Sequence, residues 1–170
     1  MSIVNTGMPE LNGPRLHGKP RSCILVVDDD YFFADLVEDT LSENSDVIYA
    51  SNGAMALEIA SQKQPDVILL DVMMPEIHGY EVCRRLKAHH RTKYIPIIFL
   101  TSLGEESSQK IGFDLGAEGY ITKPFDPAQL RVLIDGQIKQ KHAMDKQRLW
   151  RSVGTSVLHL MRLWRHEPRQ

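Results

Sequence analysis

The chain has 170 residues, of which 42% are hydrophobic and 25% are charged. That length suits one globular domain of about 100–150 residues with a segment left over. There is no signal-peptide pattern and no apolar run near the roughly 18 residues of a membrane span, so we expect a cytoplasmic protein. The two cysteines, Cys23 and Cys83, lack a CxxC spacing and are expected to be reduced packing residues.

The formal net charge of −2 conceals a strong asymmetry along the chain. Residues 1–138 hold 12 Lys and Arg against 20 Asp and Glu, a net charge of −8. Residues 139–170 hold 8 against 2, a net charge of +6. The pattern predicts an acidic domain that carries a basic tail, and the two parts are interpreted separately.

Proline and glycine recur through residues 1–20 without a sustained period, which predicts a disordered leader. Short apolar strands then alternate with helices. Strands are expected at 23–27, 47–50, 67–70, 95–100 and 119–122, and helices at 31–41, 54–63, 80–89, 105–115 and from 127 to at least 138. In the second helix, Met55 and Ile59 are expected to face inward, with Ala56 as a further candidate. Alternation of this kind predicts a doubly wound α/β fold with a five-stranded parallel sheet.

Polar side chains stand where four of these strands end. Asp28, Asp29 and Asp30 follow the first strand, Asp71 ends the central one, and Thr101 and Lys123 end the last two. The carboxyl ends of parallel strands lie at one edge of the sheet, where open α/β sheets bind their ligands. We therefore expect these groups to converge into one site.

Clustered carboxylates repel one another unless a cation joins them, and Mg²⁺ prefers such oxygen ligands. Lys123 and the Thr101 hydroxyl are suited to binding phosphoryl oxygens, and Asp71 to accepting the phosphoryl group as a nucleophile. Taken singly, each residue has a simpler interpretation, such as a helix cap or a solvated charge. Their common place at strand ends favours a phosphoryl site.

Residues 22–140, about 70% of the chain, resemble the receiver domain of two-component response regulators. The matching segments are Ile24-Leu25-Val26-Val27-Asp28-Asp29, Leu69-Leu70-Asp71-Val72-Met73-Met74-Pro75 with Gly79, Leu100-Thr101-Ser102, and Gly119-Tyr120-Ile121-Thr122-Lys123-Pro124-Phe125. The resemblance implies a CheY-like, flavodoxin-like (βα)5 fold. It also implies Mg²⁺-dependent phosphoryl transfer from a histidine kinase or phosphotransfer protein, in a chain that catalyses only its own phosphorylation and dephosphorylation.

The resemblance implies a metal site as well. Asp29 would bind Mg²⁺ directly and Asp28 through water. Asp71 and the backbone carbonyl of Met73 would complete the ligands supplied by the protein.

The resemblance further assigns Asp71 as the phospho-acceptor. Thr101 and Lys123 would bind the phosphoryl oxygens, with a cis peptide bond between Lys123 and Pro124. Tyr120 would be the aromatic switch residue that turns inward when Thr101 moves.

Two other interpretations belong to different classes. Val26 to Asp30 also fits the opening motif of haloacid-dehalogenase-like phosphatases, but no second acidic pair follows Lys123 and no cap insertion is present. A receiver-like module that only binds partners is the other alternative. The complete set of pocket residues argues against it.

The expected division is a leader at 1–20, a receiver domain at 21–140 and a basic amphipathic helical tail at 141–170. Residues 137–147 form either a spacer or a solvated extension of the last receiver helix. Beyond them an apolar stripe resumes at Trp150, Val153, Val157, Leu160, Met161 and Trp164. We expect a coiled-coil-like homodimer through the last helix and this tail, with the chain's own domain or another partner as alternatives. Neither direct nucleic-acid contact nor membrane binding is expected.

The tail also bears a faint similarity to the first dimerisation helix of histidine kinases, between Ser152 and Arg162. His159 would take the place of the phosphorylated histidine there, but Leu160 replaces the Glu that follows it. His159 is thus expected to be an ordinary polar-face residue. A receiver cut from, or derived from, a receiver–histidine kinase chain stays an alternative.

Overall fold

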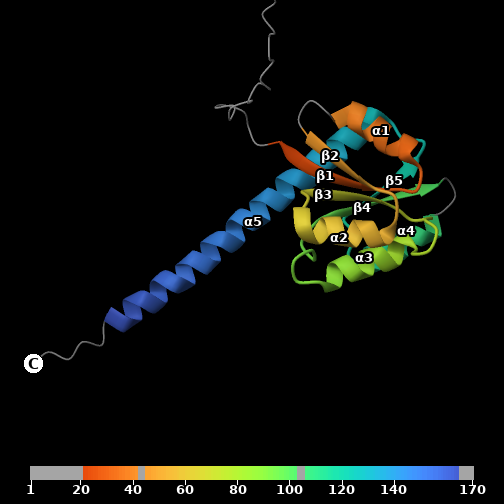
Figure 1. The fold of residues 1–170 in the computed structure, drawn as a ribbon. Coiled ribbons are helices and arrows are strands. Elements are labelled where there is room, and N and C mark those ends of the chain that lie inside the picture. The colour runs from red at the N-terminus through yellow and green to blue at the C-terminus, as the bar shows by residue number, and fades with distance from the viewer. Residues whose placement is uncertain (1–20, 42–44, 103–105, 165–170) are drawn as a thin grey trace, which may run out of the picture.

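The computed structural model describes residues 21–41, 45–102 and 106–164. The strands are β1 (Ser22–Val27), β2 (Ser45–Ala50), β3 (Val67–Asp71), β4 (Ile97–Ser102) and β5 (Gly119–Lys123). The helices are α1 (Tyr31–Leu41), α2 (Gly53–Lys63), α3 (Gly79–Ala88), α4 (Glu106–Asp114) and α5 (Pro127–Trp164). All strand pairs are parallel, in the order β2-β1-β3-β4-β5 (Figure 1). The predicted doubly wound, five-stranded parallel sheet is confirmed.

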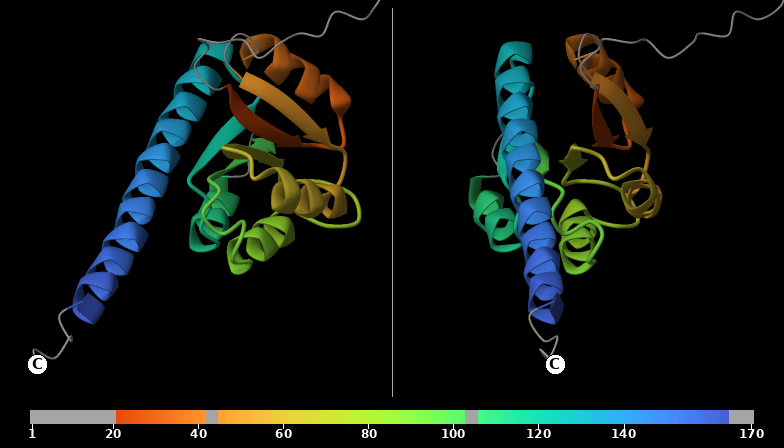
Figure 2. Two further views of the ribbon diagram at one scale, coloured as in Figure 1. Left: turned by 60° about the vertical axis from the view of Figure 1, so that its left-hand side comes forward. Right: turned by 90° about the vertical axis from the view of Figure 1, so that its left-hand side faces the viewer.

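Helices cover both faces of the sheet, with α1 and α5 on one side and α2, α3 and α4 on the other (Figures 1 and 2). Neighbouring residues of one strand therefore point to opposite faces of the sheet and pack in different hydrophobic cores. In β1, Leu25 and Val27 pack with the α2–α3 side, whereas Ile24 and Val26 pack with the α1–α5 side. Burial on both faces explains why these strands are continuous apolar runs rather than alternating ones.

Helix α2 departs from its predicted orientation. Ala56 and Ala60 are fully buried, Ile59 is half-buried, and Met55 is 42% exposed. The prediction for Met55 was wrong because α2 lies close to the sheet and to α3, so the small side chains form its inner face.

Helix α5 continues without interruption for 38 residues and passes well beyond the body of the domain (Figures 1 and 2). The segment 137–147 is therefore a solvated helix extension, not a spacer. Among the described residues, no helix combines the length and the apolar composition needed to cross a membrane.

Candidate functional site

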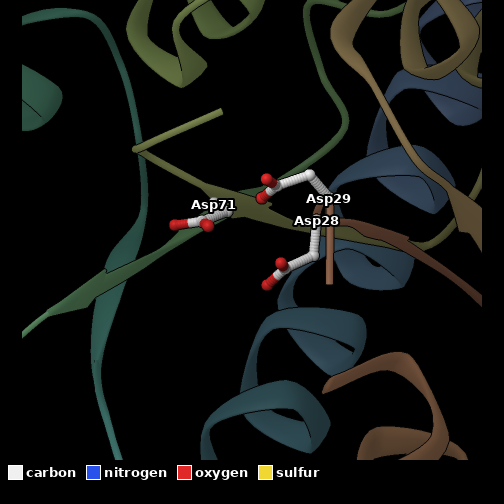
Figure 3. A group of neighbouring side chains, drawn as sticks. All are labelled: Asp28, Asp29 and Asp71. Carbon is white, nitrogen blue, oxygen red and sulfur yellow. The ribbon is translucent and has the colours of Figure 1, made fainter. Parts of the chain in front are cut away.

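Three carboxylates meet at the carboxyl edge of the sheet, as Figure 3 shows. Asp28 and Asp29 follow β1, and Asp71 is the last residue of β3. One oxygen from each lies within 4.8 Å of the others. Asp28 is 1% exposed and Asp71 9% exposed, whereas Asp29 faces solvent. The site is thus a half-enclosed cluster of negative charge that is open on the Asp29 side.

Lys123 supplies positive charge to this cluster from the end of β5. Its Nζ atom lies 2.5 Å from Asp28 Oδ2 and 3.3 Å from Asp71 Oδ2. The peptide bond from Lys123 to Pro124 is cis, as expected. The ammonium also lies 4.6 Å from the centre of the Phe33 ring, which packs edge-on against Phe125 at 5.0 Å. Lys123 is therefore positioned by both a carboxylate and an aromatic wall.

Sequence reasoning did not assign Phe33 to the site. The sequence marks Phe33 only as one of the apolar residues at helical spacing within 31–41. Its position three residues after the Asp28-Asp29-Asp30 run was the one available signal, since the first turn of α1 necessarily returns over the site.

The electrostatics of the pocket follow from burial and mutual proximity. Burial raises the pKa of Asp71; the nearby Lys123 charge opposes this, and the Asp28 charge adds to it. Burial alone would lower the pKa of Lys123, but its hydrogen bond to Asp28 and the charges of Asp71 and Asp28 outweigh burial and raise it. Lys123 therefore stays protonated, and ionisation of Asp71 lowers the stability of the folded protein.

The loop after β3 passes unusually close to its own starting point. The Gly79 amide donates to Val72 O at 3.0 Å, and the Met73 amide lies 3.3 Å from Asp71 Oδ1. A Cβ added to Gly79 would lie 2.1 Å from the Asp71 carbonyl oxygen. The loop that follows Asp71 and carries Met73 can close in this way only because residue 79 has no side chain.

Thr101 and Tyr120 occupy the neighbouring strands. Thr101 is buried near the end of β4. The half-buried Tyr120 ring stacks on Phe99 at 5.5 Å and meets Phe113 edge-on at 5.1 Å. A Cβ on Gly112 would lie 1.6 Å from the Tyr120 hydroxyl oxygen, and burial raises the pKa of Tyr120 to about 12. Tyr120 thus links the sheet to α4.

The structure brings four of the predicted pocket residues together at the ends of β1, β3 and β5: Asp28, Asp29, Asp71 and Lys123. Thr101 lies near the end of β4, the strand between β3 and β5. Met73 lies on the loop just past Asp71, with an exposed side chain. Tyr120 lies three residues before Lys123 in β5 and packs toward α4. The side chain of His159 lies outside the described part of the chain.

Residues 24–135 match the response regulator receiver domain family. The chain therefore belongs to the response regulator receiver family, and its pocket of Asp28, Asp29 and Asp71 is the acidic cluster typical of a receiver Mg²⁺ site. Membership in this family decides against the phosphatase alternative. A receiver domain implies a histidine kinase as its partner.

Among its relatives is the DNA-binding dual master transcriptional regulator RpaA of Synechocystis, which is 44% identical over 118 residues. That alignment covers 69% of this chain and 49% of RpaA. The alkaline phosphatase synthesis transcriptional regulatory protein PhoP of Bacillus subtilis is 39% identical, with 69% and 48% covered. The chain spans about half the length of these curated relatives, and the match is to their receiver part.

Solved structures agree with this assignment. A putative response regulator from Chloroflexus aurantiacus superposes with a TM-score of 0.68 at 35% identity, covering 71% of this chain and 99% of that one. The receiver domain of a signal transduction histidine kinase from Syntrophus aciditrophicus gives a TM-score of 0.65 at 32% identity, covering 70% and 91%. The chain is thus similar to receivers from both response regulators and kinases.

Proposed function

We propose that this receiver accepts a phosphoryl group on Asp71 from the phosphohistidine of a histidine kinase or phosphotransfer protein. The observation that carries the proposal is the position of the Asp71 carboxylate at the end of β3, 3.3 Å from the Lys123 ammonium and inside the acidic cluster. An Asp71 oxygen would attack phosphorus as the P–N bond breaks. The imidazole would leave with a proton, and an acyl phosphate would remain on Asp71.

The donor set of the cluster fits a hard divalent cation such as Mg²⁺. It consists of carboxylate oxygens alone, within 4.8 Å of one another, and includes two buried groups. We assign Asp29 as a direct ligand, Asp28 as a ligand through water, and Asp71 and the Met73 carbonyl as the remaining protein ligands. When bound, the ion would neutralise negative charge on the carboxylates and on the phosphoryl oxygens.

Lys123 and Thr101 would bind the transferred group. The Lys123 ammonium already lies between Asp28 and Asp71, so it can contact a phosphoryl oxygen on Asp71 without a large movement. Movement of Thr101 toward that group would free space behind it, and Tyr120 would turn further inward. This change would alter the surface that Tyr120 forms with α4.

A protein donor is supported by the apolar side chains beside the pocket. Tyr31 and Phe32 begin α1 directly after the acidic run, and Met73 follows Asp71. Each of the three is more than half exposed. Exposed apolar groups around a charged site are typical of surfaces that bind a protein partner.

We further propose that α5 reports the phosphorylation state through a homodimer. Past the body of the domain it exposes Leu149, Trp150 and Val153. Because α5 is one continuous helix, a change near β5 and the start of α5 can reach these residues directly. The division into 1–20, 21–140 and 141–170 remains a prediction, and α5 crosses the last boundary without a break.

The acceptor assignment is tested by incubating the protein with phosphoramidate and Mg²⁺, trapping the acyl phosphate with borohydride and locating it by mass spectrometry. We expect modification at Asp71, none in Asp71→Asn, and a normal yield in the control Asp39→Asn, which changes an exposed carboxylate of α1. Phosphorylation of Asp71→Asn at the wild-type level would refute the assignment.

A further inference from the structure

Helix α5 is held against its own receiver along one face. Leu130, Ile134 and Ile138 are buried in the α1–α5 core. Further along, Lys141 continues this face as a half-buried residue, and its Nζ atom lies 3.3 Å from Asp66 Oδ1. These positions recur every three or four residues, as expected for one face of a helix.

Two more contacts extend this attachment past residue 141. His142 Nε2 lies 2.9 Å from Asp66 Oδ1, and the Asp66 carboxylate also accepts from the Cys23 amide at 2.9 Å. The Arg148 guanidinium stacks 3.2 Å from the centre of the Tyr94 ring. The helix is therefore anchored to the receiver as far as Arg148.

Directly after this anchor the exposed face of α5 becomes apolar. Leu149 is 65% exposed, Trp150 67% and Val153 47%. At about 100° per residue, Trp150 and Val153 lie about 160° and 140° around the helix axis from Arg148. The apolar face therefore points away from the receiver, and α5 would have to break for this receiver to cover it.

The spacing of this face matches a helical partner. Trp150, Val153, Val157, Leu160 and Trp164 follow one another at intervals of three, four, three and four residues, the a and d positions of a heptad repeat. The same seam holds Lys139 and Lys146 nearer the receiver, so its uncharged part begins after Lys146.

The basic residues of the tail are arranged so that two copies can approach. Arg148, Arg151 and Arg162 fall at the outer b and f positions, and no Lys or Arg occupies an e or g position between residues 140 and 164. From Trp150 onward, two tails with the same positive charge can thus pair without like charges facing each other across the seam.

We propose that α5 pairs with α5 of a second copy as a parallel, in-register coiled coil that begins at Trp150, with Trp150 at an a position and Val153 at a d position. The inference rests on the proposed homodimer and specifies its orientation and register. In the parallel arrangement the two receivers lie on the outer sides of the helix pair.

This pair should be weak by itself and therefore open to regulation. Residues 150–164 make only about two heptads, roughly 22 Å of helix, which is marginal for an isolated coiled coil. The segment nevertheless continues from a helix that is already anchored at Asp66 and Tyr94, so the unfavourable nucleation step has been overcome. A short seam on an anchored helix favours a reversible dimer.

Cysteine cross-linking of the full chain tests the register. Val153→Cys places two thiols face to face in the proposed pair, whereas the matched control Arg151→Cys places them on the outer surface. Under mild oxidation we expect at least fivefold more disulfide-linked dimer from Val153→Cys, on non-reducing gels, with the wild type reporting background from Cys23 and Cys83. Equal cross-linking of the two variants would overturn the proposal.

Orientation is tested by mixing variants. In an antiparallel pair a positions face d positions, so with Val157 opposite Leu160, position 153 would face position 164. Val153→Cys would then cross-link with Trp164→Cys and not with itself. That result would also overturn the proposal. If ultracentrifugation shows only monomer with and without phosphoramidate while Asp71 is still modified, dimerisation is wrong but the phospho-acceptor function stands.

Discussion

The close approach of Gly79 to Asp71 predicts a large effect for one methyl group. In Gly79→Ala the new Cβ would lie 2.1 Å from the Asp71 carbonyl oxygen and 2.9 Å from Val72 Cα, against an ordinary contact of about 3.5 Å. Both neighbours are backbone atoms, so the loop itself must move. Such overpacking costs about 1–3 kcal/mol, and the loss of the hydrogen bond from Gly79 to Val72 adds about 1 kcal/mol.

The same substitution at Gly136 is the matched control. This position lies within α5, and a Cβ there meets nothing within 4 Å. Alanine is favoured over glycine in a helix by about 0.5–1 kcal/mol. The two Gly→Ala changes should therefore have opposite signs although their chemistry is identical.

Thermal unfolding of the metal-free protein, followed by circular dichroism, measures both effects. At about 4 °C per kcal/mol for a domain of this size, we expect Tm to fall by roughly 8–16 °C in Gly79→Ala and to rise by a few degrees in Gly136→Ala. Calorimetry should also show weaker Mg²⁺ binding by Gly79→Ala, because the displaced loop follows directly on Asp71. A Tm for Gly79→Ala within 2 °C of the wild type would refute the steric reasoning.

Three further predictions concern the charged groups. Asp29→Ala should reduce Mg²⁺ affinity more than Asp28→Ala, because Asp29 faces solvent and is proposed as the direct ligand, while Asp28 is paired with Lys123. Equal calorimetric affinities for Asp29→Ala and the wild type would contradict this. Because the pKa of Asp71 is raised by burial, its ionised form destabilises the metal-free fold, so Asp71→Asn should raise Tm at pH 7. This gain in Tm should vanish as the pH falls through the pKa of Asp71 in the folded protein toward its ordinary value of 3.8. A lower Tm for Asp71→Asn than for the wild type at pH 7 would count against this reasoning. Partial burial opposes ionisation of Asp66, but the hydrogen bond from the Cys23 amide and then the contacts with His142 and Lys141 outweigh burial and lower the pKa of Asp66. The stability that ionised Asp66 gives the fold should be complete above about pH 4. It should be lost as the pH falls through the lowered pKa of the folded state. Urea titrations of the wild type and Asp66→Asn should therefore converge in acid, and a pH-independent difference would show that ionisation of Asp66 is not the cause.

The sequence by itself determined the fold class and the members of the pocket. Runs such as Val67–Leu70 are apolar without alternation, which identifies strands buried on both faces. Once the strands are parallel, Asp28, Asp71 and Lys123 must share one edge, because each ends its strand. This inference needs only local patterns and a general rule of sheet geometry, and it did not depend on any single contact.

Only the tertiary structure decided how these groups pair and what surrounds them. Lys123 lies nearer to Asp28 than to Asp71, and Phe33 lines its other side. Met55 faces solvent although its spacing predicted the core, and α5 runs on through residues 137–147, where sequence allowed a spacer. Side-chain pairing and helix rotation depend on the packing of segments far apart in the chain. Local periodicity carries no information about how such distant segments pack, so only the folded structure determines side-chain pairing and helix rotation.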